Sequence, residues 1–329
     1  MVTENPLGKI ILGRREAIAL GLGGIATLGL AACSGDSPAP APEGGSPSGG
    51  TSSNGQIDAA VYDTVIAGGK VADDADIASS TWASKVKQSG TLRVGGVETS
   101  TLFSLRNAED NTLRGFDAGI FQLLARYILG DQNKYQLTKV TSDTRESVLT
   151  NDQVDCVFAT YSITPARKEV ISFAGPYYTS QQAILVAKSN DAITGVDSLA
   201  GKKVAVQSGS TGPGIVSEYA PKANLQEFST DEEARTALEQ GRVDAYVIDQ
   251  TMQMGAIVKN PGKYKIVGEP FGPKDNYGIG MPKDSDGVDF VNAFLKKIED
   301  DGTWAALWQV AIGDRTDVKT VPEPPAIGA

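Results

Sequence analysis

The stretch VDCVFATYSITPARKEV, residues 154–170, combines an apolar run, a group of hydroxyl side chains and a Thr-Pro step. The run VDCVF has the length and composition of a buried β-strand. Thr164 followed by Pro165 is typical of a helix start, because the hydroxyl can cap free N–H groups and proline fits the first helical position. A strand that leads directly into a helix is the repeating unit of α/β folds, in which helices cover a mostly parallel sheet.

Strand and helix signals alternate on both sides of this stretch. Before it we predict strands at 91–97 and 135–141 and helices at 115–129 and 142–152, the second helix with Ser142 as its N-cap. After it, the predicted strands are 183–188, 202–207 and 243–249. The predicted helices are 231–241 and 287–311, the second of which follows the segments 264–272 and 276–283. The strand VDAYVID of the second half closely resembles VDCVFAT of the first. We therefore predict an α/β fold of two similar lobes with a cleft between them.

The composition of the 329-residue chain limits its possible functions. A net charge of −10 argues against a nucleic-acid partner, since phosphates bind to clustered Lys and Arg. The chain has no histidine and only two cysteines, Cys33 and Cys156, which excludes a zinc site and a Cys–His nucleophile. No Asp/Asn-rich loop indicates another metal site, and no cofactor is predicted. Cys156 lies in an apolar run, where we expect an inert core residue.

The N-terminal region has the layout of an export signal. Arg14 and Arg15 precede an uncharged run, 17–32, which ends at Cys33 and is shorter than the about 20 residues that span a bilayer. The sequence LAAC at its end resembles a lipobox, in which the cysteine is lipidated. We expect residues 1–33 to be a lipoprotein signal peptide, and Cys33 to anchor an exported protein to the outer face of the cytoplasmic membrane. The arginine pair leaves Sec and twin-arginine export open. Residues 34–57 form a predicted disordered tether.

Polar side chains follow the predicted strands, at the edge where open α/β sheets bind ligands. Thr160 and Ser162 supply hydroxyl groups, and Arg167 falls in a first helical turn, where its charge opposes the helix dipole unless an anion binds. The turn at 207–211 offers a second anion site, and Asp249 ends an apolar strand and needs a cationic partner. Together they describe a site for an α-amino acid. The alternatives are a solvated arginine and a plain Ser/Gly loop.

Several segments in the same order resemble the family 3 extracellular solute-binding proteins of amino-acid ABC importers. They are GFDAGIFQLLARYI (115–128), YSITPARKEVISFAGPYY (161–178), AVQSGST (205–211), GRVDAYVID (241–249), YGIGMPK (277–283) and DGTWAALW (301–308). The resemblance runs from about residue 90 to residue 313. It implies the type II periplasmic-binding-protein fold, with 58–187 plus 274–329 as lobe 1 and 188–273 as lobe 2. It also implies a monomeric, non-enzymatic protein that captures a free amino acid and delivers it to an ABC permease.

The resemblance assigns roles to individual residues of this chain. Arg167 would clamp the α-carboxylate with help from Ser162, and Asp249 would bind the α-ammonium. The Ser/Thr turn of the second lobe corresponds to Ser210 and Thr211. A sensing role, in which the closed form is presented to a membrane receptor, is an alternative that the sequence does not separate from transport.

The segment VTSDTRESVL, 140–149, points to an acidic ligand. It resembles the T-S-x-x-R segment of the glutamate/aspartate-binding subgroup, which implies that Ser142 and Arg145 hold a side-chain carboxylate. Thr160 matches a hydroxyl position of the same subgroup. The plain alternative is that Ser142 caps a helix and Arg145 lies on its surface.

Two features of that subgroup have no match here. Its first-lobe arginine is missing, with Arg106 as a conceivable substitute, and its second-lobe histidine falls near Asp231. Glutamate or aspartate is the predicted ligand, and glutamine or asparagine is the alternative. Phe103 is expected to line the cleft. A dehydratase on the same fold would need a general acid, for which Glu98 is the candidate.

Overall fold

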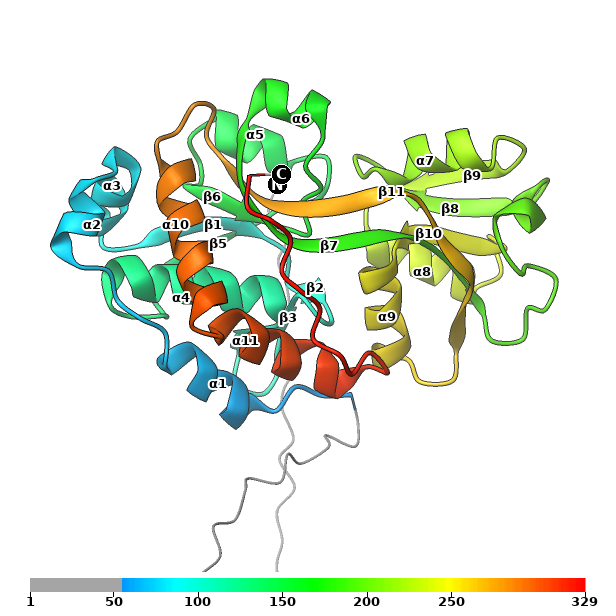
Figure 1. Ribbon diagram of the computed structural model, residues 1–329. Coiled ribbons are helices and arrows are strands. Elements are labelled where there is room, and N and C mark those ends of the chain that lie inside the picture. The colour runs from blue at the N-terminus through cyan, green and yellow to red at the C-terminus, as the bar shows by residue number, and fades with distance from the viewer. Residues whose placement is uncertain (1–54, 329) are drawn as a thin grey trace, which may run out of the picture. The chain divides into compact units, whose positions relative to one another are not determined.

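A computed structural model describes residues 55–328 of the chain (Figure 1). The predicted signal peptide, Cys33 and all but the end of the predicted tether lie outside these residues. Among the described residues, no helix has the length and apolar character needed to cross a membrane.

One eight-stranded sheet runs through the unit in the order β5-β1-β6-β11-β7-β10-β8-β9. The strands are β1 (Leu92–Gly96), β5 (Tyr135–Lys139), β6 (Cys156–Phe158), β7 (Ser172–Ala187), β8 (Lys203–Gln207), β9 (Asn224–Phe228), β10 (Ala245–Asp249) and β11 (Tyr264–Met281). The pairs among β5, β1 and β6 and among β10, β8 and β9 are parallel, whereas β7 and β11 are antiparallel to each other and to the strands beside them. Two mostly parallel groups of strands are thus joined by a central antiparallel pair.

The long strands β7 and β11 cross from one lobe to the other (Figure 1). At one end Ala174 and Tyr177 pack into the core of the first lobe, and at the other end Ile184 and Val186 pack into the second. The predicted strand at 183–188 is therefore the end of a much longer strand. Residues 179–182 of β7 lie between these two groups, and the predicted lobe boundaries stay a prediction.

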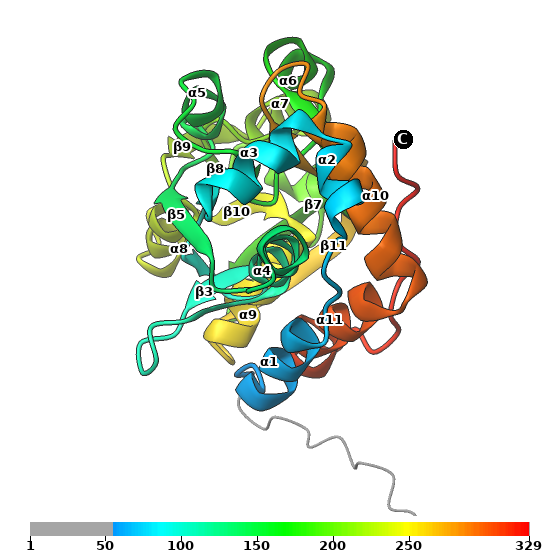
Figure 2. The ribbon, with the colours of Figure 1, turned by 90° about the vertical axis from the view of Figure 1, so that its left-hand side faces the viewer.

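Helices cover the sheet on both faces. They are α1 (Ala59–Ala67), α2 (Asp74–Ala78), α3 (Thr81–Ser89), α4 (Phe116–Leu129), α5 (Arg145–Thr150), α6 (Pro165–Val170), α7 (Gly212–Tyr219), α8 (Asp231–Glu239), α9 (Gln250–Lys259), α10 (Gly287–Asp300) and α11 (Thr303–Ala311). In the first lobe the C-terminal helices α10 and α11 lie beside the N-terminal helices α1 and α3 (Figure 2). A small second sheet contains β2 (Thr99–Ser100), β3 (Ser104–Arg106) and β4 (Leu113–Arg114).

The second lobe has a separate apolar layer on each face of its strands. Val247 of β10 packs in one layer, whereas its neighbours Tyr246 and Ile248 pack in the other. This alternation is what a strand with helices on both faces requires. Cys156 is fully buried in the first core and burial raises the pKa of its thiol, in agreement with the predicted inert role.

Local chemistry explains which predicted boundaries hold. The helix start at Thr164 is confirmed, since its hydroxyl accepts a hydrogen bond from the Arg167 N–H at 3.3 Å. The N-cap at Ser142 is wrong: α5 begins at Arg145, because the Thr144 hydroxyl accepts from the Thr141 N–H at 2.8 Å and holds the preceding turn closed.

The single helix predicted for 287–311 is also wrong, since it divides into α10 and α11. Gly302 separates the two helices with φ +81°, a left-handed conformation that side chains with a Cβ rarely adopt.

We expect Gly302→Ala to lower the free energy of unfolding by about 1 kcal/mol, because only backbone strain changes at a position with no atom within 4 Å of the added Cβ. Gly214→Ala is the matched control. Gly214 lies inside α7, also with open space around it, so alanine there should stabilise the protein by up to about 1 kcal/mol. Urea unfolding of both variants measures the difference, and equal effects at the two positions would contradict the assigned helix break.

Candidate functional site

Two arginine side chains meet beside the end of β6. Arg167 of α6 donates from Nη1 to the Ser162 carbonyl and from Nη2 to the Gly209 carbonyl, both at 2.8 Å. Arg145 of α5 donates from Nη1 to the Ala159 carbonyl at 3.1 Å and from Nη2 to the same Gly209 carbonyl at 3.4 Å. The two guanidinium groups therefore converge on one oxygen atom, which belongs to the turn after β8 in the other lobe.

Little negative charge offsets these two arginines. Arg145 is 3% exposed and, among the described residues, has no carboxylate within the 4 Å range of an ion pair, while its Nε atom is buried without a partner. Arg167 is 8% exposed, and its Nε lies 3.8 Å from a carboxylate oxygen of Glu146, which is partly in solvent. Burial, and then the charge of Arg167, lower the pKa of Arg145 to about 10. The site is electropositive and suited to an anion.

Tyr161 supports both guanidinium groups from one side. The centre of the Arg145 guanidinium lies 3.9 Å above the ring, and that of Arg167 lies 5.2 Å away. An aromatic face attracts a cation without neutralising it. The tyrosine therefore orients the two arginines and leaves their charge available to a ligand.

The turn between β6 and α6 depends on a buried acid. Thr160 has a left-handed backbone, φ +44°, and its N–H donates to Oδ2 of Asp117 at 2.9 Å. The Tyr177 hydroxyl donates to Oδ1 of the same carboxylate at 2.7 Å. Asp117 lies at the start of α4 and is fully buried, and this burial raises its pKa to about 6. The sequence signal for this role is a lone carboxylate among the apolar residues of that helix.

A group of buried acids and neutral donors surrounds the middle of β7. Asp249 at the end of β10 accepts hydrogen bonds from Gln182 and, at 2.8 Å, from the Tyr277 hydroxyl. The Thr211 hydroxyl donates to Asp275 at 3.0 Å and accepts from Gln182 at 3.3 Å. Burial, and then the neighbouring Asp275, raise the pKa of Asp249 well above its usual range. Asp275 was missed because it lies at the predicted boundary between the lobes, where no ligand contact was assigned.

The turn after β8 brings the two sides together. Gly209 has φ +67°, and a Cβ there would collide with the Ser142–Asp143 backbone. The neighbouring Ser208 hydroxyl donates to an Asp143 carboxylate oxygen at 2.6 Å. Glycine thus permits the close approach that places its carbonyl oxygen within reach of both arginines.

The protein-family model for bacterial extracellular solute-binding proteins, family 3, matches residues 92–313. The chain belongs to this family. This solute-binding protein is 37% identical over 201 residues to the glutamine-binding protein of Geobacillus stearothermophilus, a match that covers 61% of this chain and 76% of the relative. It is 32% identical over 242 residues to the glutamate-binding protein GluB of Corynebacterium efficiens, covering 70% and 82% of the two chains.

A solved structure also matches the fold of this solute-binding protein. The ancestral amino acid-binding protein AncCDT-1, described as a precursor of cyclohexadienyl dehydratase, superposes with a TM-score of 0.62 at 31% identity, covering 70% of this chain and 98% of that chain. The predicted family and the predicted type II periplasmic-binding-protein fold are confirmed. The relatives named here are described as binding proteins.

Some predicted site residues contact the arginine pair or the group of buried acids, and others do not. Ser162 joins through its carbonyl oxygen and Thr211 through its hydroxyl. The Ser210 hydroxyl donates to the Gln207 carbonyl at 2.7 Å and so closes its own turn, and the Thr160 hydroxyl is turned to the Ala159 carbonyl at 2.8 Å. Ser142 lies in the loop that approaches Gly209. Their assignment to ligand binding stays a prediction.

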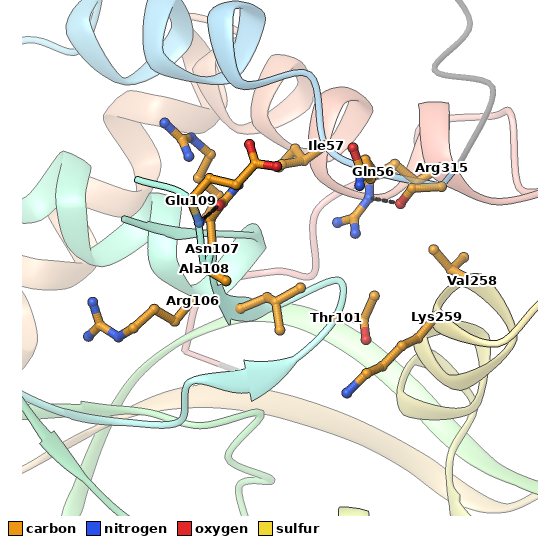
Figure 3. Close-up of a pocket in the computed structure, with 13 residues that line it drawn as sticks. Gln56, Ile57, Thr101, Arg106, Asn107, Ala108, Glu109, Val258, Lys259 and Arg315 are labelled. Carbon is orange, nitrogen blue, oxygen red and sulfur yellow. Dashed lines mark hydrogen bonds between the residues drawn. The ribbon is translucent and has the colours of Figure 1, made fainter. Parts of the chain in front are cut away.

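Three residues whose part in ligand binding the sequence did not decide form contacts away from the arginine pair. Arg106 donates to Glu98 at 2.7 Å, and it lines a separate cavity of about 400 Å³ together with Thr101, Lys259 and Arg315 (Figure 3). Arg106 therefore does not replace the missing first-lobe arginine beside Arg145. Asp231, at the position of the subgroup's histidine, accepts from Arg235 and from the Tyr246 hydroxyl. Phe103 is fully buried, and its ring contacts those of Phe116, Tyr178 and Tyr277.

Glu98 is poorly suited to act as a general acid. Its burial opposes ionisation, but hydrogen bonds from Lys139 and Arg106 outweigh that effect and lower its pKa. A carboxylate paired in this way remains ionised at neutral pH and has no proton to donate.

Because the pKa of Asp117 is raised, the stability of the folded protein should depend on pH in a specific way. An unfolded aspartate titrates near 3.9, whereas the buried one titrates near 6, so the folded state holds the proton more tightly. The contribution of this group to stability is complete below about pH 4 and is lost as the pH rises through about 6.

We therefore expect the unfolding free energy of the protein, relative to that of Asp117→Asn, to fall between about pH 4 and pH 7, by up to about 3 kcal/mol. Urea unfolding at four pH values measures this difference. Asp289→Asn, at an exposed position of α10, is the control and should follow the unmodified protein at every pH. A pH-independent difference for Asp117→Asn would show that its carboxylate does not titrate as the geometry implies.

Proposed function

We propose that this protein captures glutamate or aspartate outside the cytoplasmic membrane and delivers it to an ABC permease. The observation that carries the proposal is the pair of buried guanidinium groups of Arg145 and Arg167, which share the Gly209 carbonyl and have hardly any carboxylate to offset them. The ligand's α-carboxylate would bind to Arg167 and its side-chain carboxylate to Arg145. The α-ammonium would bind to Asp249 at the opposite side of the site.

Charge distinguishes the acidic amino acids from their amides. A buried guanidinium bonded only to carbonyl oxygens keeps most of its desolvation cost, and a carboxylate offsets it in a charge-assisted, two-point contact. Glutamate brings a carboxylate to each arginine, whereas glutamine brings a neutral amide to Arg145. Glutamine remains the alternative ligand, since one relative is named for glutamine and another for glutamate.

A thermal-shift screen against the amino acids tests the ligand class. A ligand that binds only the folded state raises the melting temperature in proportion to its concentration relative to Kd. We expect the largest shifts from glutamate and aspartate and smaller ones from glutamine and asparagine. A larger shift with glutamine would assign the protein to the alternative ligand.

Paired arginine variants separate the two roles. Arg167→Gln should weaken the binding of every amino acid ligand by about 2–5 kcal/mol, because it removes one partner of a buried charge pair. Arg145→Gln should weaken the binding of glutamate much more than the binding of glutamine, because the variant loses only the contact with the ligand's side-chain carboxylate. Titration calorimetry measures both, with Arg242→Gln on an exposed turn as the control that keeps both affinities. Equal losses for glutamate and glutamine in Arg145→Gln would remove the argument for an acidic ligand.

We also propose that a lipid on Cys33 holds the protein at the outer face of the membrane, on the strength of the LAAC motif and the Ser/Gly/Pro-rich segment after it. Cys33→Ser removes the thiol that would carry the lipid, so we expect the variant to move from the membrane pellet to the soluble fraction. Fractionation followed by immunoblotting measures this. A variant that stays in the pellet would indicate a different anchor.

A further inference from the structure

The site contains two buried carboxylates on one face of the sheet, one on each side of β7. In the register of β7, Gln182 pairs with Asp249 of β10, and Ser180 pairs with Asp275 of β11. Because residues two apart on a strand share a face, the two acids lie on the same face of the sheet, on opposite sides of β7. Gln182 and Thr211 link them through a chain of hydrogen bonds.

Only neutral groups contact this pair. Asp249 is 6% exposed and Asp275 is 7% exposed, and within the described residues neither forms an ion pair with a lysine or arginine within 4 Å. Tyr277 of β11 donates to Asp249, and Tyr246 of β10 and Arg145 of α5 are the other titratable groups that interact with it. Burial and the neighbouring Asp275 raise the pKa of Asp249 more than the charge of Arg145 lowers it, which favours one proton shared within this hydrogen-bonded pair.

We propose that Asp275 and Asp249 together form the ammonium-binding site, and that the pair releases its proton to solvent when the ligand's ammonium group binds. This inference rests on the proposed function, since it assumes an amino acid as the ligand. No covalent bond forms: the ammonium keeps its three protons, and the proton shared by the acids leaves as the cation takes over their neutralisation. Asp275 thus acts as a second determinant of specificity for a primary amine.

Two consequences distinguish this site from a single aspartate. Affinity should rise with pH, because the ligand competes with a proton, by up to about tenfold per pH unit while the pair remains protonated. Dicarboxylates without an amine, such as glutarate, should bind at least about 100-fold more weakly than glutamate, because they leave the acid pair without a cation.

Titration calorimetry of glutamate at pH 7 in phosphate, HEPES and Tris tests the inference, because a released proton is taken up by the buffer and adds its ionisation enthalpy to the heat. We expect the binding enthalpy to vary linearly with the buffer's ionisation enthalpy, with between about half a proton and one proton released. Asp275→Asn should reduce this number to near zero and make Kd independent of pH. Glu146→Gln, which changes the other acid near the site, should leave the number of released protons unchanged.

The outcomes separate the two proposals. A protein that binds glutamate or glutamine with the same enthalpy in all three buffers, and with a Kd that does not change between pH 5.5 and pH 8, contradicts the proton release while the proposed function stands. Proton release that persists in Asp275→Asn contradicts the role of Asp275. A protein that binds none of the four acidic and amide amino acids contradicts the proposed function itself.

Discussion

The structure depends on how two buried positive charges are held without a full negative partner. Arg145 is the first residue of α5 and Arg167 lies in the first turn of α6, so the positive ends of two short helices add to the charge instead of offsetting it. Carbonyl oxygens and the face of Tyr161 orient the guanidinium groups but neutralise neither. Such an arrangement is unfavourable by itself and becomes favourable with an anion beside it.

The carbonyls that hold the arginines come from a segment whose shape is set in the first-lobe core. The Ala159 and Ser162 carbonyls flank Thr160, and the left-handed backbone of Thr160 is held by its bond to Asp117. A buried carboxylate in α4 therefore governs the direction of two acceptors near the cleft. This connects core packing to the geometry of the candidate site through a single short turn.

Much of the fold and part of the candidate site could be predicted from the sequence, because periodic apolar runs and strand-end polar residues are local features. Arg167 and Asp249 were recognisable for that reason, whereas Arg145 was assigned only through the resemblance of its segment to the T-S-x-x-R segment of a subgroup of the family. Asp275 was not, because its partner lies on another strand and the register of β11 shifts between Phe271 and Asp275. The N-cap at Ser142 failed because Thr141 and Thr144 form a competing local hydrogen bond. The full length of β7 was hidden because its middle, from Tyr178 to Gln182, is polar where the strand crosses between the lobes.

The polar middle of β7 lies both where the lobes would move relative to each other and where the ligand is proposed to bind. The two long strands pass from one lobe to the other at Ser180 and Gln182 of β7 and at Asp275 and Tyr277 of β11. The groups proposed to bind the ammonium therefore lie where the lobes would hinge. Before the ligand binds, one proton on the acid pair and two arginines leave the site with an excess of one positive charge, if the partly solvated Glu146 is set aside. Once the ligand's ammonium group has displaced that proton, the two acids and the two arginines balance each other, so net charge alone does not select the ligand. Selection then depends on which groups face each other: the acids at the hinge require an amine, and Arg145 distinguishes a side-chain carboxylate from an amide.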